Sequence, residues 1–281
     1  MSLILFIFIL SFGLSNQINN IPQNIETLSK MNGDSFIDNI ISKHHHDNYY
    51  RLALIQYPGE ISSGQLSYGD KYKSYYIQSN FLNINYGKLS NDSGDSFTAN
   101  EYMIQLSIAR EYRNDWIVGS EVGYSKSKIR EYINQNIIHS IGVRKSFSKD
   151  KIIIGLTLEN MIHSIQEYSN ISIKHEPYKK ISFQLKPNHI NSEFSMHYTS
   201  YNHTSSEIII SASNYIGDHI HFMTGKSLQL SNSSFVSTDT FFENLSMGMG
   251  VSSNSYKIDL GFQYLGDFGI IIGTSLLINI K

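Results

Sequence analysis

The sequence predicts an all-β fold, an antiparallel transmembrane β-barrel of about 14 strands with a short N-terminal helical or plug segment. Three observations predict this fold. Large apolar side chains alternate with polar or small ones along most of the chain, the connections alternate between long and tight, and aromatic residues bracket the apolar runs. The composition agrees, because the 281 residues include 19 Tyr and 15 Phe but only 4 Pro, which favours strands.

The start of the chain predicts export from the cytoplasm. Leu3 to Leu10 form an unbroken apolar run, LILFIFIL, and Gly13-Leu14-Ser15 is a small-x-small triplet suited to cleavage before Asn16. We therefore expect a cleaved signal peptide over residues 1–15. Because no Lys or Arg precedes the apolar run, an uncleaved anchor is the alternative.

A polar N-terminal segment over residues 16–48 is expected to precede the barrel, which we place at residues 49–281 as one domain. Within that segment, residues 31–43 carry apolar side chains at helical spacing. This stretch is a candidate plug helix.

Period-two alternation is clearest near the end of the chain. From Leu245 to Val251 the large apolar residues fall on every second position, and only Ser and Gly stand between them. An extended strand converts this period into two distinct faces. Runs of the same kind predict strands, with boundaries soft by about 2 to 4 residues, at 51–57, 61–68, 74–87, 101–112, 116–127, 135–147, 151–162, 179–186, 191–200, 207–215, 219–226, 244–251, 256–264 and 270–280.

The connections between these strands alternate in length, as they do in bacterial outer-membrane barrels, where short periplasmic turns face longer outer loops. The expected long connections are Lys88 to Asn100, His163 to Tyr178, Tyr201 to Ser206, Ser227 to Glu243 and Leu265 to Gly269. The expected tight ones are Arg113 to Asp115, Ser148 to Asp150, Pro187 to Ile190, Ile216 to Asp218 and Ser252 to Ser255. The short outer connection around Pro58-Gly59 is the exception.

Alternation alone does not choose between a membrane barrel and a soluble β-sandwich, since each strand of a sandwich also buries one face. Aromatic pairs favour the membrane, because in tilted strands their spacing separates the rings by roughly 20 to 25 Å, close to the distance between two aromatic girdles. These pairs are Tyr102 and Tyr112, Trp116 and Tyr124, and Tyr256 and Tyr264. The final strand, with Gly273, Leu276 and Ile278, also has the G-x-x-Φ-x-Φ pattern of barrel assembly signals.

A bilayer location constrains the rest of the fold. Backbone polar groups cannot remain unpaired in hydrocarbon, so the strands must close, with an outer face against outer-membrane lipid and a lumen that is hydrated or plugged. The inward polar set is expected to include Glu111, Glu121, Arg144, Glu159, His197, His219, His221, Lys257 and Asp259.

Four stretches resemble the PorV/PorQ family of outer-membrane barrels, most closely its PorQ branch, and that family is itself similar to the FadL-type channels. They are NYGKLSNDSGDSFTANEYMIQLSIAREY, DWIVGSEVGYSKSKI, IGLTLENM and GFQYLGDFG. The family's strand ends and turns are matched by Tyr86-Gly87, Gly94, Glu101-Tyr102, Arg110, Asn160-Met161 and Leu265 to Gly269.

This resemblance implies a non-enzymatic component of the type IX protein secretion system that anchors a PorZ-like surface partner, beside a sortase-like subunit, for cargo attachment. Partner binding would fall to the outer loops, with Asn91, Asp95, Phe97, Tyr168, Phe235 and Phe241 as candidate residues. The alternative function is a FadL-like passive channel for hydrophobic small molecules. Such a channel needs a continuous apolar path through the lumen, and the expected inward charges weigh against it.

Other kinds of site find little support in the sequence. A formal net charge of -2 does not suggest nucleic acid, and no Cys is present to form disulfides or thiolate metal sites. The sequence contains no G-x-S-x-G, H-E-x-x-H or P-loop motif, so we expect neither catalysis nor a cofactor. Weak metal candidates are His44 and His46, next to Asp47, and His219 and His221. Adjacent residues of the first group cannot all point at one ion, and the sequence fixes no carboxylate near the second pair.

Overall fold

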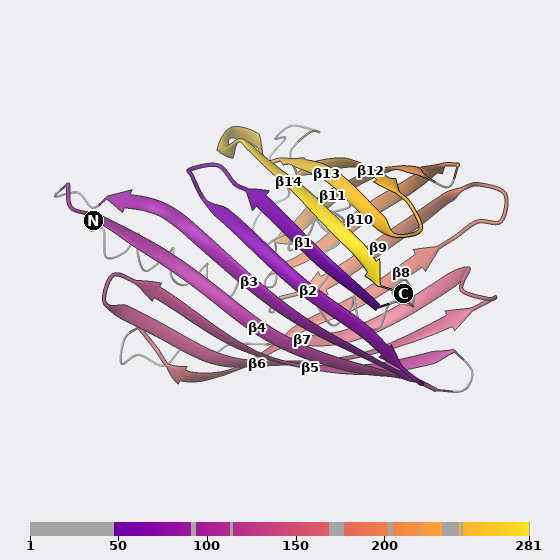
Figure 1. The fold of residues 1–281 in the computed structure, drawn as a ribbon, viewed down its shortest axis with the longest axis horizontal. Helices are drawn as coiled ribbons and strands as arrows, with labels where there is room; N and C mark the ends of the chain where they lie inside the picture. Colours follow the sequence, from indigo (N-terminus) through magenta and orange to yellow (C-terminus); the bar gives the residue numbers. More distant parts are fainter. Residues whose placement is uncertain are drawn as a thin grey trace.

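Fourteen antiparallel strands close into a single barrel (Figure 1). This computed structural model describes residues 48–90, 94–112, 115–168, 177–201, 205–217, 219–231, 242 and 244–280. Each strand pairs with its neighbours in the sequence, and β1 pairs with β14 to complete the ring. The predicted all-β barrel is therefore confirmed. The expected signal peptide, the plug helix, His44 and His46 lie outside the described residues.

All of the strands predicted from the sequence are present, with boundaries shifted by a few residues. They are β1 (Asn48–Gln56), β2 (Ser62–Tyr72), β3 (Tyr75–Ser90), β4 (Ser96–Tyr112), β5 (Trp116–Ile129), β6 (Tyr132–Phe147), β7 (Ile152–Gln166), β8 (Tyr178–Leu185), β9 (Ser192–Ser200), β10 (Ser205–Ile216), β11 (Ile220–Ser231), β12 (Leu245–Ser252), β13 (Tyr256–Tyr264) and β14 (Ile270–Ile280). A short 3-10 helix, η1 (Gly266–Phe268), lies between the last two strands. In the described ranges no helix is long and apolar enough to cross a membrane.

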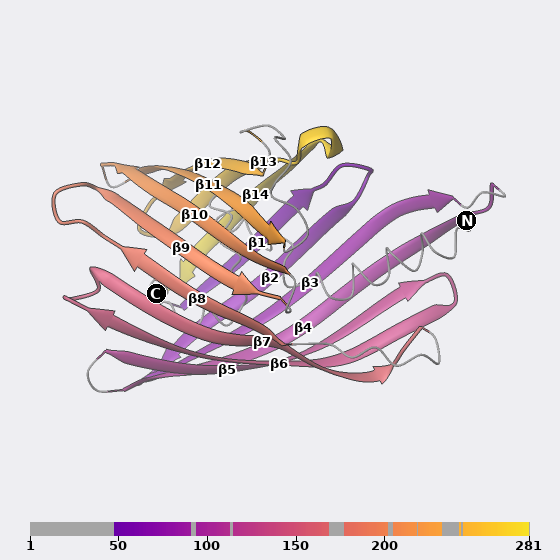
Figure 2. The same cartoon turned by 180° about the vertical axis from the view of Figure 1, so that it is seen from behind.

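The two ends of the barrel differ largely as the loop pattern predicted, except that the connection 130–131, at the end with the longest loops, has only two residues. The connections 73–74, 113–115, 148–151, 186–191, 217–219 and 253–255 lie at one end, which we call the tight-turn end. Asn48 and Ile280, at the outer limits of β1 and β14, pair at this same end. The remaining connections lie at the opposite end, which we call the loop end. Figure 2 shows the strands crossing between these ends at a strong tilt.

The wall is taller on one side than on the other. Strands β3 to β7 run for 14 to 17 residues, whereas β8, β9, β12 and β13 have 8 or 9. Because β3 extends to Ser90 and β4 begins at Ser96, much of the expected long connection Lys88 to Asn100 belongs to these two strands. The hairpin continues past a bulge at Gly87, whose φ of 69° is readily adopted by glycine, and pairs Lys88 with Thr98.

The outer surface carries an apolar belt around the barrel. On β13, for example, Leu260 is 52% exposed, whereas the neighbouring Asp259, which faces inward, is 4% exposed. Met247 and Met249 on β12 are exposed in the same way. Exposed apolar side chains of this kind occur on every strand, far beyond the isolated patches of a soluble protein. Every strand therefore presents exposed apolar side chains on the outer surface, as in a membrane barrel and unlike a sandwich.

Aromatic rings flank this belt. Tyr112 and Trp116 are exposed beside the tight-turn end, and Tyr256 occupies the same level on β13. Nearer the loop end, the rings of Tyr102 and Tyr124 lie 6.5 Å apart on adjacent strands. The two levels correspond to the girdles expected where hydrocarbon gives way to headgroups.

A charge placed on the belt should destabilise the protein according to its depth. We predict that Leu260→Arg, in the middle of β13, costs about 2 to 4 kcal/mol of folding free energy in phospholipid vesicles. Tyr256→Arg, on the same face at the tight-turn end, should cost about 1 kcal/mol or less. Denaturant titration followed by the fluorescence of the single tryptophan, Trp116, measures both. Equal costs at the two positions would contradict a belt that faces hydrocarbon.

Candidate functional site: the barrel lumen

The lumen is lined by polar side chains, as predicted. Glu121, Arg144, Glu159, His197, His221 and Asp259 all face inward and are buried. Glu111 and Lys257 have the inward parity but lie close to the tight-turn end and are only partly buried. His219 belongs to the connection before β11 and is exposed. The alternation thus identified the inward residues of the strands correctly, but the inward assignment of His219 was wrong, because β11 begins only at Ile220.

A chain of hydrogen-bonded side chains crosses β2 to β5 inside the barrel, and we call it the polar ladder. The Gln65 amide donates to Asn80 Oδ1 at 2.8 Å, Asn80 donates to Gln105 Oε1 at 3.0 Å, and Gln105 donates to Glu121 Oε1 at 3.0 Å. Ser107 donates to the second Glu121 oxygen at 3.1 Å. The four longer side chains are between 1% and 4% exposed. Because Asn80 and Gln105 each donate one bond and accept another, the ladder fixes their side chains in one arrangement.

Closer to the loop end the lining becomes apolar. A buried apolar cluster is formed there by Leu82, Ile84, Tyr86, Ala99, Met103 and Ile138. Beside it, the Tyr86 hydroxyl donates to Glu101 Oε2 at 3.0 Å, so the one carboxyl group next to the cluster has a partner. The inward charges predicted from the sequence weighed against an apolar path through the lumen. In addition to those charges, the structure has an apolar stretch of lining near the loop end.

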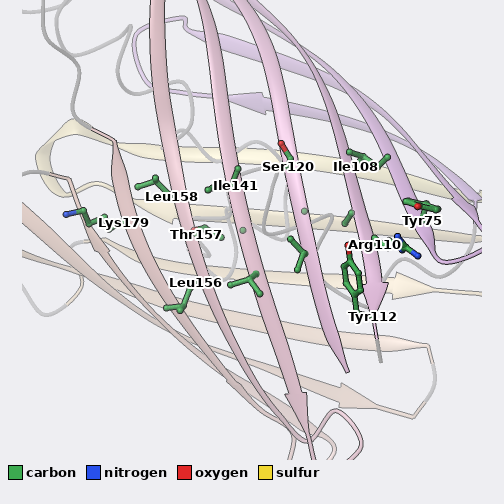
Figure 3. A pocket seen from close by; sticks show the side chains of 15 residues that line it. Tyr75, Ile108, Arg110, Tyr112, Ser120, Ile141, Leu156, Thr157, Leu158 and Lys179 are labelled. Carbon is green, nitrogen blue, oxygen red and sulfur yellow. The ribbon is translucent and has the colours of Figure 1, made fainter. Parts of the chain in front are cut away.

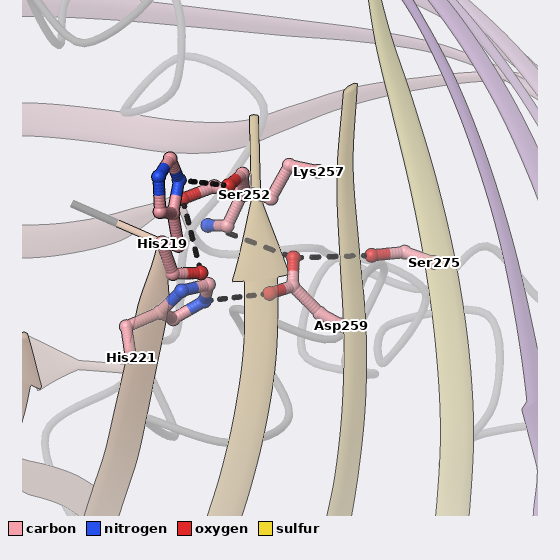
Figure 4. Close-up of polar contacts among 6 residues, drawn as sticks. All are labelled: His219, His221, Ser252, Lys257, Asp259 and Ser275. Atoms are coloured by element: carbon pink, nitrogen blue, oxygen red, sulfur yellow. Dashed lines mark hydrogen bonds and ion pairs between the residues drawn. The ribbon is translucent and has the colours of Figure 1, made fainter. Parts of the chain in front are cut away.

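Across the barrel, β11 to β14 carry a second polar cluster (Figure 4). His221 Nε2 lies 2.6 Å from Asp259 Oδ1, and both side chains are buried. The other carboxylate oxygen, Oδ2, lies 3.5 Å from Lys257 Nζ and accepts a hydrogen bond from Ser275 at 3.5 Å. Asp259 therefore joins three strands through one carboxylate.

Gly250 makes the contact between His221 and Asp259 possible. The register places Gly250 between them, opposite His221 on one side and Asp259 on the other. A Cβ atom at Gly250 would lie 2.0 Å from Asp259 Oδ1 and 2.4 Å from His221 Cε1. Asp259 could not be predicted from the sequence as the partner of His221, because these residues belong to strands that are not consecutive and meet only across Gly250.

The metal candidates do not gather into a site in the described part of the chain. There, no three His, Cys, Asp or Glu side chains come together in a way that could hold an ion. His219 Nδ1 lies 3.1 Å from the Ser252 carbonyl oxygen, whereas His221 contacts Asp259. The two histidines thus have separate partners.

The candidate partner-binding residues lie at the loop end where they are described. Asp95 is exposed, and the Phe97 ring lies under Arg130, whose Cζ is 4.4 Å from the ring centroid. Tyr168 donates a hydrogen bond to Ser127 and is half-buried. Asn91, Phe235 and Phe241 lie outside the described residues, so partner binding at these loops remains a prediction.

A closed barrel with an apolar outer belt, two aromatic levels and a polar lumen defines a transmembrane β-barrel. No family model matches the chain, and no curated protein matches its sequence. Among solved structures, it resembles the CymD monoaromatic hydrocarbon channel with a TM-score of 0.68 and 9% identity, over 93% of this chain and 99% of that one. The Ralstonia pickettii toluene transporter TbuX gives 0.66 and 8% identity over 93% and 100%.

A deletion mutant of the TodX monoaromatic hydrocarbon channel, deltaS2S3, matches with a TM-score of 0.55 and 8% identity, over 83% of this chain and 91% of that one. At such identities the likeness concerns the fold alone. The chain therefore has the fold of FadL-like outer-membrane channels. The roles of its lumen residues follow from their own contacts and not from the residues of those channels.

The glycine in the His221 cluster provides a test of the lumen packing. We predict that Gly250→Ala lowers the free energy of unfolding by about 1 to 3 kcal/mol, because the added methyl forces His221 and Asp259 apart. Gly64→Ala is the control, since its Cβ would meet Leu54 Cδ2 at an ordinary 3.6 Å. Denaturant titration of both variants makes the comparison. If Gly250→Ala is as stable as the control, the buried contact is absent from the folded protein.

Proposed function

We propose that the protein is a passive outer-membrane channel for hydrophobic small molecules. The observation that carries the proposal is the buried apolar cluster, with Leu82 and Met103 facing into the barrel at the loop end. The shared fold supports it, because the two most similar solved structures described above are named as a monoaromatic hydrocarbon channel and a toluene transporter.

The arrangement of the lining suggests how an apolar solute would pass. Transfer from water to the apolar cluster is favourable, so the loop end provides an entry where a small hydrophobic molecule is held without directional bonds. The polar ladder lies beside the cluster and further from the loop end. The ladder is held together by hydrogen bonds between side chains. A solute that moves past it would therefore displace these side chains but would not have to break a covalent bond or an ion pair.

The proposed function places the protein in the outer membrane and involves no catalysed reaction. The apolar belt fits a bilayer, and the tight-turn end would face the periplasm, as it does in bacterial barrels with short periplasmic turns. The expected signal peptide would deliver the chain to that compartment. Transport through such a lumen is diffusion down a gradient, and it needs neither a catalytic group nor a cofactor.

Uptake by reconstituted vesicles tests this function. We predict that vesicles containing the protein accumulate labelled toluene-like solutes faster than empty vesicles, and that Met103→Gln slows this uptake by roughly tenfold, because a buried amide without a partner disfavours an apolar solute. Met223→Gln is a matched control: Met223 is also buried and inward, on β11, outside the apolar cluster.

Gel mobility before and after heating confirms that each variant is folded. Uptake no faster than through empty vesicles would exclude the channel. Equal slowing by Met103→Gln and Met223→Gln would exclude the apolar cluster as the entry site.

The second candidate is the PorQ-like role in type IX secretion. It is supported by the sequence resemblance in strands and turns, and by the polar ladder, whose buried, mutually bonded side chains suit a barrel that holds partners rather than passing solutes. In that role the loop end would bind a PorZ-like surface protein and a sortase-like subunit.

Crosslinking in the native outer membrane distinguishes the two functions. For a channel we expect the tagged protein to be captured without stoichiometric partners, as identified by mass spectrometry. Recovery of a PorZ-like and a sortase-like protein, lost when Phe97 and Tyr168 are replaced by Ser, would instead establish the secretion role. An unrelated barrel with the same tag controls for capture of abundant membrane proteins.

A further inference from the structure

A groove lies on the outer wall of the barrel, across β4 to β8 (Figure 3). Its volume of about 770 Å³ is in the range of small-molecule sites. The strand register places Ile108, Ser120, Ile141 and Leu158 in one row across the wall. Ser120 is the smallest side chain of this row, so the surface is hollow between Ile108 and Ile141, and the Ser120 hydroxyl lies 3.0 Å from His139 Nε2. The groove faces the membrane and is separate from the lumen.

Two cations line the groove: Lys179, which pairs with Leu158 on the neighbouring strand, and Arg110 near the tight-turn end. Arg110 lies near the end of β4, two residues before the strand stops at the tight-turn end. Its Cζ is 5.1 Å from the centroid of the Tyr75 ring and 5.0 Å from that of Tyr112. Stacking on rings uses the face of a guanidinium and leaves the N–H groups at its edge available as donors.

Those donors have no anionic partner in the described part of the chain. The neighbouring carboxylate of Glu111 points to the opposite face of β4, where it accepts a hydrogen bond from the Tyr76 hydroxyl at 3.0 Å. On a nearby strand, Lys145 adds a second positive charge at the same level, with Nζ 4.8 Å from the Trp116 ring centroid. The headgroup level of the wall is therefore positively charged beside an apolar hollow.

We propose that this groove binds one anionic phospholipid, with an acyl chain over Val118, Ile141 and Leu156 and the headgroup phosphate at the edge of Arg110. The depth of Arg110 fits a phosphate of the periplasmic leaflet, and a guanidinium binds phosphate through paired, charge-assisted hydrogen bonds. A purely apolar ligand would leave this cation unmatched. The proposal requires that the barrel lies in a membrane but not that it transports anything.

Native mass spectrometry of the purified, full-length barrel with phosphatidylglycerol tests the site. We expect a one-lipid complex whose apparent affinity falls roughly tenfold or more in Arg110→Gln, because a charge-assisted hydrogen bond is lost. Arg130→Gln is the control: Arg130 also lies over an aromatic ring, that of Phe97, but at the loop end and outside the groove. This control should bind lipid as the unchanged protein does.

A second variant tests the apolar part of the groove without changing its charge. Ser120→Phe fills the hollow, so it should weaken lipid binding although Arg110 is intact. If Arg110→Gln does not fold, the lipid affinity of Ser120→Phe tests the proposed site by itself. Equal lipid binding by Arg110→Gln, Ser120→Phe and Arg130→Gln would overturn the proposal. So would competition by glycerol phosphate as strong as that by the intact lipid, since the acyl chain would then contribute nothing.

Discussion

The structure depends on one constraint, the cost of leaving a backbone N–H or C=O group unpaired in hydrocarbon. The pairing of β1 with β14 satisfies it, because that ladder removes the two edges which an open sheet would expose. Once the sheet is closed, alternation assigns every side chain to lipid or to lumen. A hydrophobic outer face, which would aggregate in water, then becomes the surface that holds the protein in the bilayer.

Closure of the barrel also removes the inward-facing polar side chains from bulk water. Polar side chains removed from bulk water need partners, and here they find them across strands: the polar ladder joins β2 to β5, and Asp259 joins β11, β13 and β14. These networks orient one part of the lining. The apolar cluster at the loop end needs no such partners, and under the proposed function it is where a solute would be held.

The sequence was sufficient for the fold because period two is a local property that each strand displays by itself. It was insufficient for the lumen. From Leu82 to Tyr86 the alternation on β3 is reversed: the apolar side chains face inward, and Asn83 and Asn85 face outward. Period two shows that a strand has two faces, but it does not tell which of them lines the lumen. The contact of His221 with Asp259 depends on a register across Gly250 and could not be predicted from strands taken singly. Arg110 was singled out only as a family strand end, because its ring contacts come from two different strands.

The most direct test of the channel is an experimental structure of the protein in lipid with a bromobenzene-like solute, whose bromine can be located by anomalous scattering. The account predicts a bromine site inside the barrel, in contact with Leu82, Met103 and Ile138. Sites only on the outer belt, or no ordered site although the crystals contain the solute, would contradict a lumen built to receive hydrophobic molecules.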